Sequence, residues 1–174
     1  LPSMIVNVVR GGPDADNRAS ANRIALLPEK GGGHGDYKLI VLAPASVQEM
    51  YDFVQLSFDL AFKYRNPAMI LSDGAIGQMM EKVEIGEQKK RLTDAEVKER
   101  CPWATTGKDA NRERNIITSL DLDSNKQEIF NQKLQAKYKE IQENEVRFEE
   151  IQTEDAEYTM VAQLSPPQAT GPLI

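Results

Sequence analysis

An α/β fold is the class that this sequence predicts. Two observations predict it: an apolar run near the N-terminus, and a helical segment that lies between two further apolar runs. Residues 3–9 are mostly apolar and β-branched, which is typical of a strand buried on both faces of a parallel sheet. Two further apolar runs, residues 38–43 and 68–71, flank a segment with helical periodicity. A strand, a helix and a strand in this order predict one right-handed βαβ unit.

The helix of this unit has a well-marked start. Ser46 and Glu49 have the spacing of a capping box, in which each side chain bonds an amide of the first turn. The helix is expected to end near Tyr64, ahead of an Asn-Pro pair. Apolar residues at helical spacing predict a stripe that packs on the sheet: Val47, Met50, Val54, Phe58 and Ala61.

The second half of the chain predicts a linker followed by a long helix. Residues 86–118 show no sustained periodicity apart from a possible short helix at 94–100. Ser124 and Gln127 have capping-box spacing and predict a helix from about Asn125 to Gln152. Its apolar stripe is formed by Phe130, Leu134, Tyr138, Ile141 and Phe148.

We expect four segments along the chain. They are an α/β domain at 1–85, a linker at 86–118, a bridging helix at 119–153, and the start of a second domain with an atypical tail at 154–174. The last segment opens with a predicted strand at 157–162 and then turns into proline-containing sequence. Both ends are interpreted as truncations, and a truncated sheet would expose an unpaired edge that favours association.

Composition argues against several classes of function. The chain has 27 acidic and 21 basic residues and a formal charge of −6, which argues against binding nucleic acid or anionic membranes. Its one cysteine, Cys101, allows no intramolecular disulfide and no cysteine-rich metal or iron–sulfur site. No apolar run approaches the roughly 20 residues of a membrane span, and the N-terminus lacks a signal-peptide pattern. We therefore expect a soluble, cytoplasmic protein.

Arg10, Gly11 and Gly12 form the first candidate site, because they follow a predicted buried strand. In open α/β sheets, ligands bind at the carboxyl ends of the strands. The Arg10 guanidinium could hold a carboxylate by two hydrogen bonds, and the glycines would let a ligand approach the backbone. The alternative is that Arg10 pairs with an acid across an interface.

Other candidates lie in glycine-containing turns. His34 and Asp36 belong to the run Gly-Gly-Gly-His-Gly-Asp at 31–36, which precedes a strand and therefore lacks the order of a phosphate loop. The run is either a tight turn or a site loop in which His34 acts as an acid or base. Asp73 ends the third predicted strand and could orient a cofactor or a loop, or simply shape a turn. No Ser-His-Asp set, Walker motif or dinucleotide fingerprint occurs.

Several ordered blocks resemble one known family, the alpha subunits of 2-oxoacid:ferredoxin oxidoreductases. The blocks are Leu-Pro-Ser-Met-Ile-Val-Asn-Val-Val-Arg-Gly-Gly-Pro at 1–13, the stretch 31–51, Lys-Tyr-Arg-Asn-Pro at 63–67, Leu-Ser-Asp-Gly at 71–74, Trp-Ala-Thr-Thr-Gly at 103–107 and Glu-Asn-Glu-Val-Arg at 143–147. Together they extend over most of the chain up to about residue 162. Gln-Met-Met-Glu at 78–81 is most similar to the branched-chain 2-oxoacid branch, and the 2-oxoglutarate branch is close to it.

The resemblance implies a partial parallel sheet of the thiamine diphosphate pyrimidine-binding type, followed by a domain similar to the C-terminal domain of transketolase. It implies coenzyme A-dependent oxidative decarboxylation of a 2-oxoacid, with thiamine diphosphate and magnesium held at an interface with another subunit. Iron–sulfur clusters would lie on partner subunits only. The implied partners are beta and gamma subunits and a ferredoxin-like delta subunit or ferredoxin. Arg10 falls where the family has an arginine near the substrate carboxylate.

The chain also departs from the family. The glutamate that activates the aminopyrimidine ring lies upstream of these residues, while residues 14–30 and the tail after 162 do not follow the family pattern. We therefore expect this chain by itself to be inactive. The alternatives are a non-catalytic assembly module, or a regulatory domain that binds a small anion through Arg10 and the glycine run. Saturable anion binding by the isolated monomer that is lost in Arg10→Ala would indicate the regulatory domain.

Overall fold

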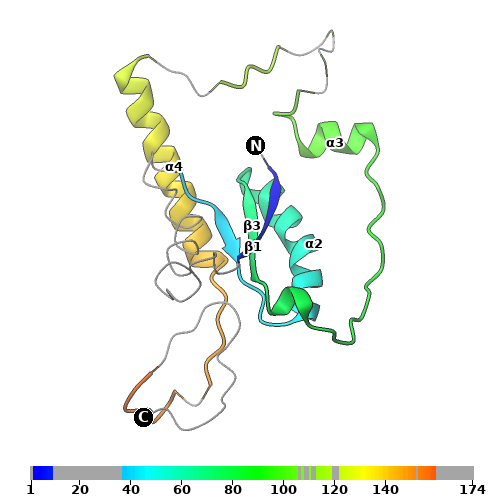
Figure 1. Cartoon of the computed structure of the whole chain (residues 1–174). Coiled ribbons are helices and arrows are strands. Elements are labelled where there is room, and N and C mark those ends of the chain that lie inside the picture. The colour runs from blue at the N-terminus through cyan, green and yellow to red at the C-terminus, as the bar shows by residue number, and fades with distance from the viewer. Residues whose placement is uncertain are drawn as a thin grey trace. The chain divides into compact units, whose positions relative to one another are not determined.

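A computed structural model describes residues 2–9, 37–105, 107, 110, 113–118, 122–151 and 153–159 of this chain. It confirms the α/β class with a three-stranded parallel sheet and helices (Figure 1). The elements, in chain order, are β1 Met4–Val9, β2 Ile40–Leu42, α2 Val47–Tyr64, β3 Ala68–Asp73, the 3₁₀ helix η2 Ile76–Gln78, α3 Asp94–Arg100 and α4 Ser124–Asn144.

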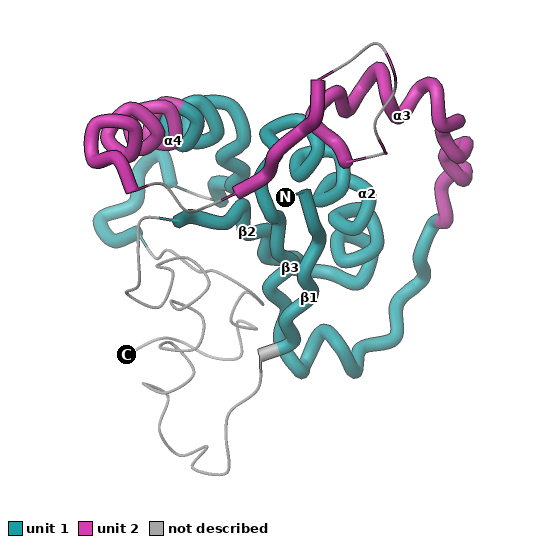
Figure 2. The backbone as a smooth tube through the Cα atoms, turned by 90° about the horizontal axis from the view of Figure 1, so that it is seen from above, with its two compact units in different colours: residues 1–84, 137–174 teal, residues 85–136 magenta. Residues whose placement is uncertain are grey.

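The chain forms two compact units (Figure 2). One contains residues 1–84 and 137–174, with the sheet, α2 and the end of α4. The other contains residues 85–136, with α3 and the first part of α4. The boundary between the units therefore falls inside α4.

The sheet has the order β1-β3-β2, and both pairs of neighbours are parallel. β3 is the central strand, and its residues from Ala68 to Ser72 are all buried. It is two residues longer than the predicted 68–71, whereas β2 is shorter than the predicted 38–43. Because β2, α2 and β3 follow one another in the chain and the two strands are parallel neighbours, the predicted βαβ unit is present.

Helix α2 has the predicted limits. The Ser46 side chain accepts a hydrogen bond from the Glu49 amide at 3.1 Å, which satisfies one donor of the first turn. The Glu49 carboxylate accepts from the Ala45 amide at 2.7 Å, one residue before the position that a capping box uses. At the other end, Arg65 adopts a left-handed conformation (φ 48°) and its amide bonds the Ala61 carbonyl, which stops the helix.

The stripe predicted for α2 is partly wrong. Ala61 is buried as expected, but Val54 and Phe58 are 37% and 46% exposed. The face that packs on the sheet carries Ser57, Leu60 and Ala61 instead. Because apolar side chains occur on more than one side of this helix, several faces satisfy the helical spacing, and periodicity alone cannot select the buried one.

One hydrophobic cluster holds the first unit together. Its buried members come from β2, α2 and β3: Ile40, Leu42, Leu60, Ala61, Tyr64 and Ala68. The partly buried side chains of Phe53, Leu56 and Ile141 pack against it. Since Ile141 belongs to α4, the end of this long helix contributes to the core of the α/β unit.

Helix α4 starts earlier and ends earlier than predicted. The Asp123 side chain accepts from the Asn125 amide at 3.0 Å, so Asp123 rather than Ser124 provides the cap. The helix ends at Asn144 instead of Gln152. Phe148 therefore lies beyond the helix and is 76% exposed, so its predicted place in the apolar stripe is wrong. Tyr138 of the same stripe is buried as expected.

The second unit contains several polar contacts. The short helix predicted at 94–100 is confirmed as α3, and Thr93 with Glu96 forms a complete capping box. The Asn115 side chain donates to the carbonyls of Pro102 (2.7 Å) and Ala104 (3.1 Å). No residue of α3 is buried.

The strand predicted at 157–162 is not formed in its described part. Residues 157–159 form bends and coil, and the other three residues lie outside the described part of the chain. None of the helices in the described ranges is long and apolar enough to span a bilayer.

Candidate functional site

The carboxyl edge of the sheet is the place to examine for a ligand site. β1 and β3 reach this edge together, since Val9 and Asp73 are partners in the strand register. Arg10 directly follows Val9 in the sequence. Arg10, Gly11, Gly12, His34 and Asp36 all lie outside the described residues, so their predicted roles stay predictions.

Asp73 shapes the turn that follows β3. Its Oδ1 atom accepts a hydrogen bond from the Ile76 amide at 2.8 Å, which satisfies a donor at the start of η2. Ile76 is buried, and a side-chain carbon added at Gly77 would lie 3.8 Å from Val8 Cγ1. The turn is therefore packed against β1. The turn-forming interpretation of Asp73 accounts for this contact, and a role toward a cofactor stays a prediction.

The segment after η2 closes the amino end of α2, which lies at the same edge (Figure 1). The Glu81 carboxylate accepts from the Val47 amide at 3.0 Å. The Gln48 side chain forms two hydrogen bonds with the backbone of Glu84, accepting from its amide at 2.7 Å and donating to its carbonyl at 3.3 Å. The sequence analysis did not predict these contacts. They join residues more than 30 positions apart, and no local sequence pattern predicts them.

These contacts change the chemistry of the helix terminus. Unsatisfied first-turn amides and the helix dipole make a free N-terminus attractive to phosphate. Here the carboxylates of Glu49 and Glu81 and the hydroxyl of Ser46 already accept from amides at this end. A diphosphate would have to displace two negative charges, so the start of α2 does not fit such a group.

No metal site is visible at this edge or elsewhere in the described ranges. Among the residues with described positions, no three His, Cys, Asp or Glu side chains form a group that could hold a metal ion. The described part of this chain thus shows no group of residues that would bind a diphosphate or its magnesium ion.

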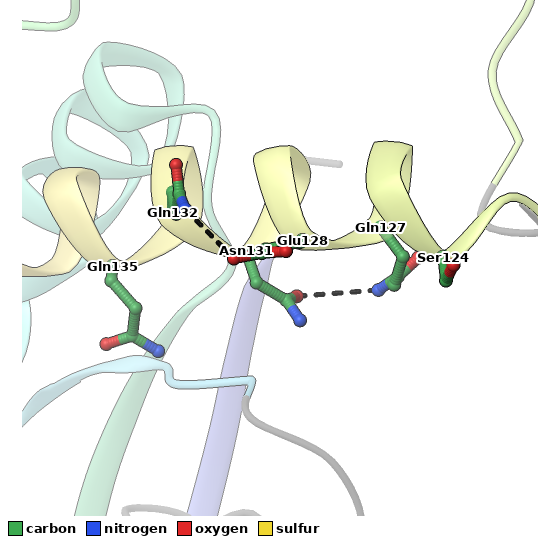
Figure 3. A pocket seen from close by; sticks show the side chains of 6 residues that line it. All are labelled: Ser124, Gln127, Glu128, Asn131, Gln132 and Gln135. Carbon is green, nitrogen blue, oxygen red and sulfur yellow. Dashed lines mark hydrogen bonds between the residues drawn. The ribbon is translucent and has the colours of Figure 1, made fainter.

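A shallow hollow lies on α4 in the second unit (Figure 3). It is lined by Ser124, Gln127, Glu128, Asn131, Gln132 and Gln135. Gln127 donates to Asn131, and Gln132 donates to Glu128, each at 3.4 Å. All of its side chains come from one helix, and none belongs to the predicted site. The hollow offers amides, one hydroxyl and one carboxylate and is not a convincing catalytic centre.

The family of the chain follows from comparison with known proteins. Residues 1–160 match the family described as "Pyruvate flavodoxin/ferredoxin oxidoreductase, thiamine diP-bdg". The chain belongs to this family. The resemblance seen in the sequence is therefore confirmed, and the α/β unit is part of the thiamine diphosphate-binding region that defines this oxidoreductase family.

Relatives within this oxidoreductase family are subunits of larger proteins. The ketoisovalerate oxidoreductase subunit VorB of Methanothermobacter thermautotrophicus is 45% identical over 168 residues, which are 93% of this chain and 44% of the relative. The 2-oxoglutarate synthase subunit KorA of the same organism is 42% identical over 89 residues, 51% of this chain and 24% of the relative. KorA of Methanocaldococcus jannaschii is 44% identical over 82 residues, 47% of this chain and 22% of the relative. The chain thus spans less than half the length of these relatives.

Proposed function

We propose that this chain is part of the alpha subunit of a 2-oxoacid:ferredoxin oxidoreductase that acts on a branched-chain 2-oxoacid. The complete enzyme would decarboxylate the 2-oxoacid oxidatively, transfer the acyl group to coenzyme A, and pass the electrons to ferredoxin. The supporting observation is the 45% identity to a ketoisovalerate oxidoreductase subunit over 93% of this chain. The matches to 2-oxoglutarate synthase subunits extend over only about half of the chain, which favours the branched-chain substrate.

The role proposed for Arg10 is to bind the carboxylate of the 2-oxoacid. In its support, Val9 lies opposite Asp73 at the carboxyl edge of the sheet, the edge at which open α/β sheets bind ligands. A guanidinium can grip a carboxylate through two parallel hydrogen bonds, and Gly11 and Gly12 leave room for close approach. His34 and Asp36 are proposed to belong to a loop at the same site, with Asp73 fixing the neighbouring turn.

The proposed cofactor is thiamine diphosphate, which supplies the electron sink that decarboxylation of a 2-oxoacid requires. Its diphosphate and magnesium are proposed to be held mainly by another subunit. In support, the amides at the start of α2 are occupied by carboxylates, and the described residues form no metal-binding group. Iron–sulfur clusters are assigned to partner subunits, since this chain has one cysteine.

The proposed partners are beta and gamma subunits and a ferredoxin-like delta subunit or ferredoxin, in the cytoplasm. In support, relatives are named as subunits of oxidoreductases or synthases. The complete subunit should therefore co-purify with its partners when they are expressed together.

The test is a 2-oxoacid-dependent dye-reduction assay on the co-expressed complex with the complete subunit, thiamine diphosphate, magnesium and coenzyme A. We expect higher kcat/KM for ketoisovalerate than for 2-oxoglutarate. Arg10→Lys should lower kcat/KM by about 10- to 100-fold, since a lysine cannot form the two-pronged contact. The matched control is Arg91→Lys in an exposed coil, which should leave kcat/KM unchanged.

The possible failures can be told apart. A complex that turns over no 2-oxoacid would contradict the proposed function as a whole. Turnover that is unaffected in Arg10→Lys would contradict only the role of Arg10. Preference for 2-oxoglutarate would contradict the branched-chain assignment.

A further inference from the structure

Apolar side chains of β1 are exposed on the face of the sheet that α2 covers. By the strand register, Val6 lies beside Ile70 of β3, which in turn lies beside Leu42 of β2. Paired residues of neighbouring strands point to the same face of a sheet. Leu42 belongs to the hydrophobic cluster that packs with α2. Val6, and Val8 two residues further on, therefore point to the face that α2 covers, yet each is about half exposed.

Helix α2 packs on one side and leaves apolar side chains open on the other. Leu56 packs against the cluster, whose strand residues come from β2 and from the start of β3. Phe58 is two residues further on and points to nearly the opposite side of the helix, since each residue turns by about 100°. Val54 and Phe62 lie four residues to either side of Phe58 and continue its row. Because β1 and β2 flank β3 on opposite sides, this row lies on the side of α2 toward β1.

The exposed side chains of β1 and α2 belong to one part of the α/β unit. α2 contacts β1 directly, and the two elements lie next to each other in Figure 2. We call the exposed parts of Val6, Val8, Val54, Phe58 and Phe62 the β1-side surface. Its area is on the order of 400 Å², because a whole aromatic side chain offers about 150–250 Å² and these residues are roughly half exposed. An apolar patch of this size on a single chain often marks a contact surface.

The size of the β1-side surface favours a segment of the same polypeptide over a second chain as its cover. A stable interface between two chains buries about 800 Å² on each partner, roughly twice what this surface offers. A tethered segment needs less contact area, since its tether gives it a high effective concentration. Relatives contain further chain that could supply it, because the 168 matched residues are only 44% of the ketoisovalerate oxidoreductase subunit VorB.

A helix is the element that fits this position. Parallel sheets have both faces covered by helices, and neighbouring helices pack about 8–10 Å apart. We propose that in the complete subunit an amphipathic helix from outside these 174 residues packs on the β1-side surface, over β1 and beside α2. It would bury Val6 and Val8 beneath it and Phe58 at its flank. The inference rests on the proposed function only in that the chain is part of a longer subunit.

Photo-cross-linking tests which segment covers the surface, in the complete subunit alone and in the co-expressed complex. A benzoylphenylalanine in place of Phe58 should link to one segment of the same subunit outside this chain, identified by mass spectrometry of the linked peptides. The matched control carries the same group in place of Asp52, on the polar side of α2, where the carboxylate accepts from Gln48. This control should lose the link.

Oxidation by hydroxyl radicals tests burial without a substitution. Phe58 should be oxidised about 5-fold more slowly in the complete subunit than in the 174-residue chain, because burial removes most of its exposed area. Tyr64 is buried in the α/β unit already and should be oxidised slowly in both proteins.

Three outcomes would overturn the proposal. A link to a second copy or to another subunit would make the surface an interface between chains. A link to residues 10–36 or 160–174 would assign the cover to this chain itself. Equal oxidation of Phe58 in both proteins would show that the surface stays open. None of these measurements depends on turnover, so an inactive complex would contradict the proposed function and leave this inference standing.

Discussion

At the scale of single residues, Ser57 is the least satisfied part of the core. Its side chain is fully buried on the face of α2 that packs on the sheet, and its hydroxyl has no hydrogen-bond partner among the described residues. A buried polar group without a partner costs about 1–3 kcal/mol. We expect Ser57→Ala to increase the free energy of unfolding by about 1 kcal/mol, because alanine removes the unpaired hydroxyl and favours the helix. A lower midpoint of urea unfolding in the variant would contradict this account.

Glu145 is the residue whose ionisation should affect stability. Its carboxylate accepts from Lys63 Nζ and from the Tyr64 hydroxyl, each at 2.7 Å. The hydrogen bond from Lys63 is the main reason that the pKa of Glu145 is lowered, and the bond from Tyr64 adds to it. The same contact with Glu145 is the main reason that the pKa of Lys63 is raised.

The pH dependence of stability follows from the lowered pKa of Glu145 and the raised pKa of Lys63. A carboxylate with a lowered pKa stabilises the fold above its unfolded pKa of about 4.3, and this contribution is lost as the pH falls through the folded value. The raised pKa of Lys63 stabilises the fold below its unfolded value of about 10.4, and this part is lost as the pH rises further. We expect Glu145→Gln to lose stability at pH 7 and to show a flatter decline of the urea midpoint between pH 5 and pH 2. Glu143→Gln, which removes an exposed carboxylate 3.8 Å from Lys139, should follow the wild-type curve, and identical curves for both variants would exclude the role of Glu145.

At the scale of elements, the cap of α2 gives a direct test. Ser46→Ala removes the acceptor of the Glu49 amide and should cost about 1 kcal/mol in the free energy of unfolding. The matched change is Thr93→Ala, which removes the equivalent acceptor of α3. Because α3 has no buried residue, fraying of this helix should leave the unfolding of the α/β unit nearly unchanged. Equal losses in the two variants would show that both helices belong to one cooperative structure.

The elements that the sequence predicted well are those with local signals. The limits of β1 and α3, and the cap and end of α2, follow from β-branched runs, cap residues and spacing within one turn. The prediction that β1 is buried on both faces is wrong, because Ile5, Val6 and Val8 are 41%, 51% and 50% exposed. The errors arise where tertiary contacts decide. The buried face of α2 is selected by the sheet, and α4 ends at Asn144, just before Glu145 bonds Lys63 and Tyr64 of α2.

In the candidate site, too, local features could be predicted and tertiary contacts could not. The position of Asp73 at the end of β3 could be predicted, because a buried run and a Ser-Asp-Gly turn are both local patterns. The contacts of Glu81 with Val47 and of Glu84 with Gln48 at the start of α2 join residues far apart in sequence. Sequence spacing carries no information on such pairs, whereas a shared fold brings them together.

At the scale of the whole molecule, stability is distributed unevenly between the two units. The buried residues of the sheet and of α2 form one cluster, and β3 is bonded to a strand on each side. In the second unit, α3 buries no side chain, and residues 85–92 form an exposed coil. Regions with few buried contacts open with a lower free energy than the core.

Hydrogen exchange should therefore follow a fixed order along the chain. We expect the amides of β3 to exchange slowest, with those of α2 next, and at least about 1,000-fold more slowly than amides of residues 85–92. α3 should exchange at an intermediate rate, since its amides are hydrogen-bonded but reached by local opening. Mass spectrometry of peptides after deuterium labelling measures all of these segments in one experiment. Protection of residues 85–92 equal to that of β3 would contradict the uneven distribution, because an exposed coil gains such protection only when it is covered by packed structure.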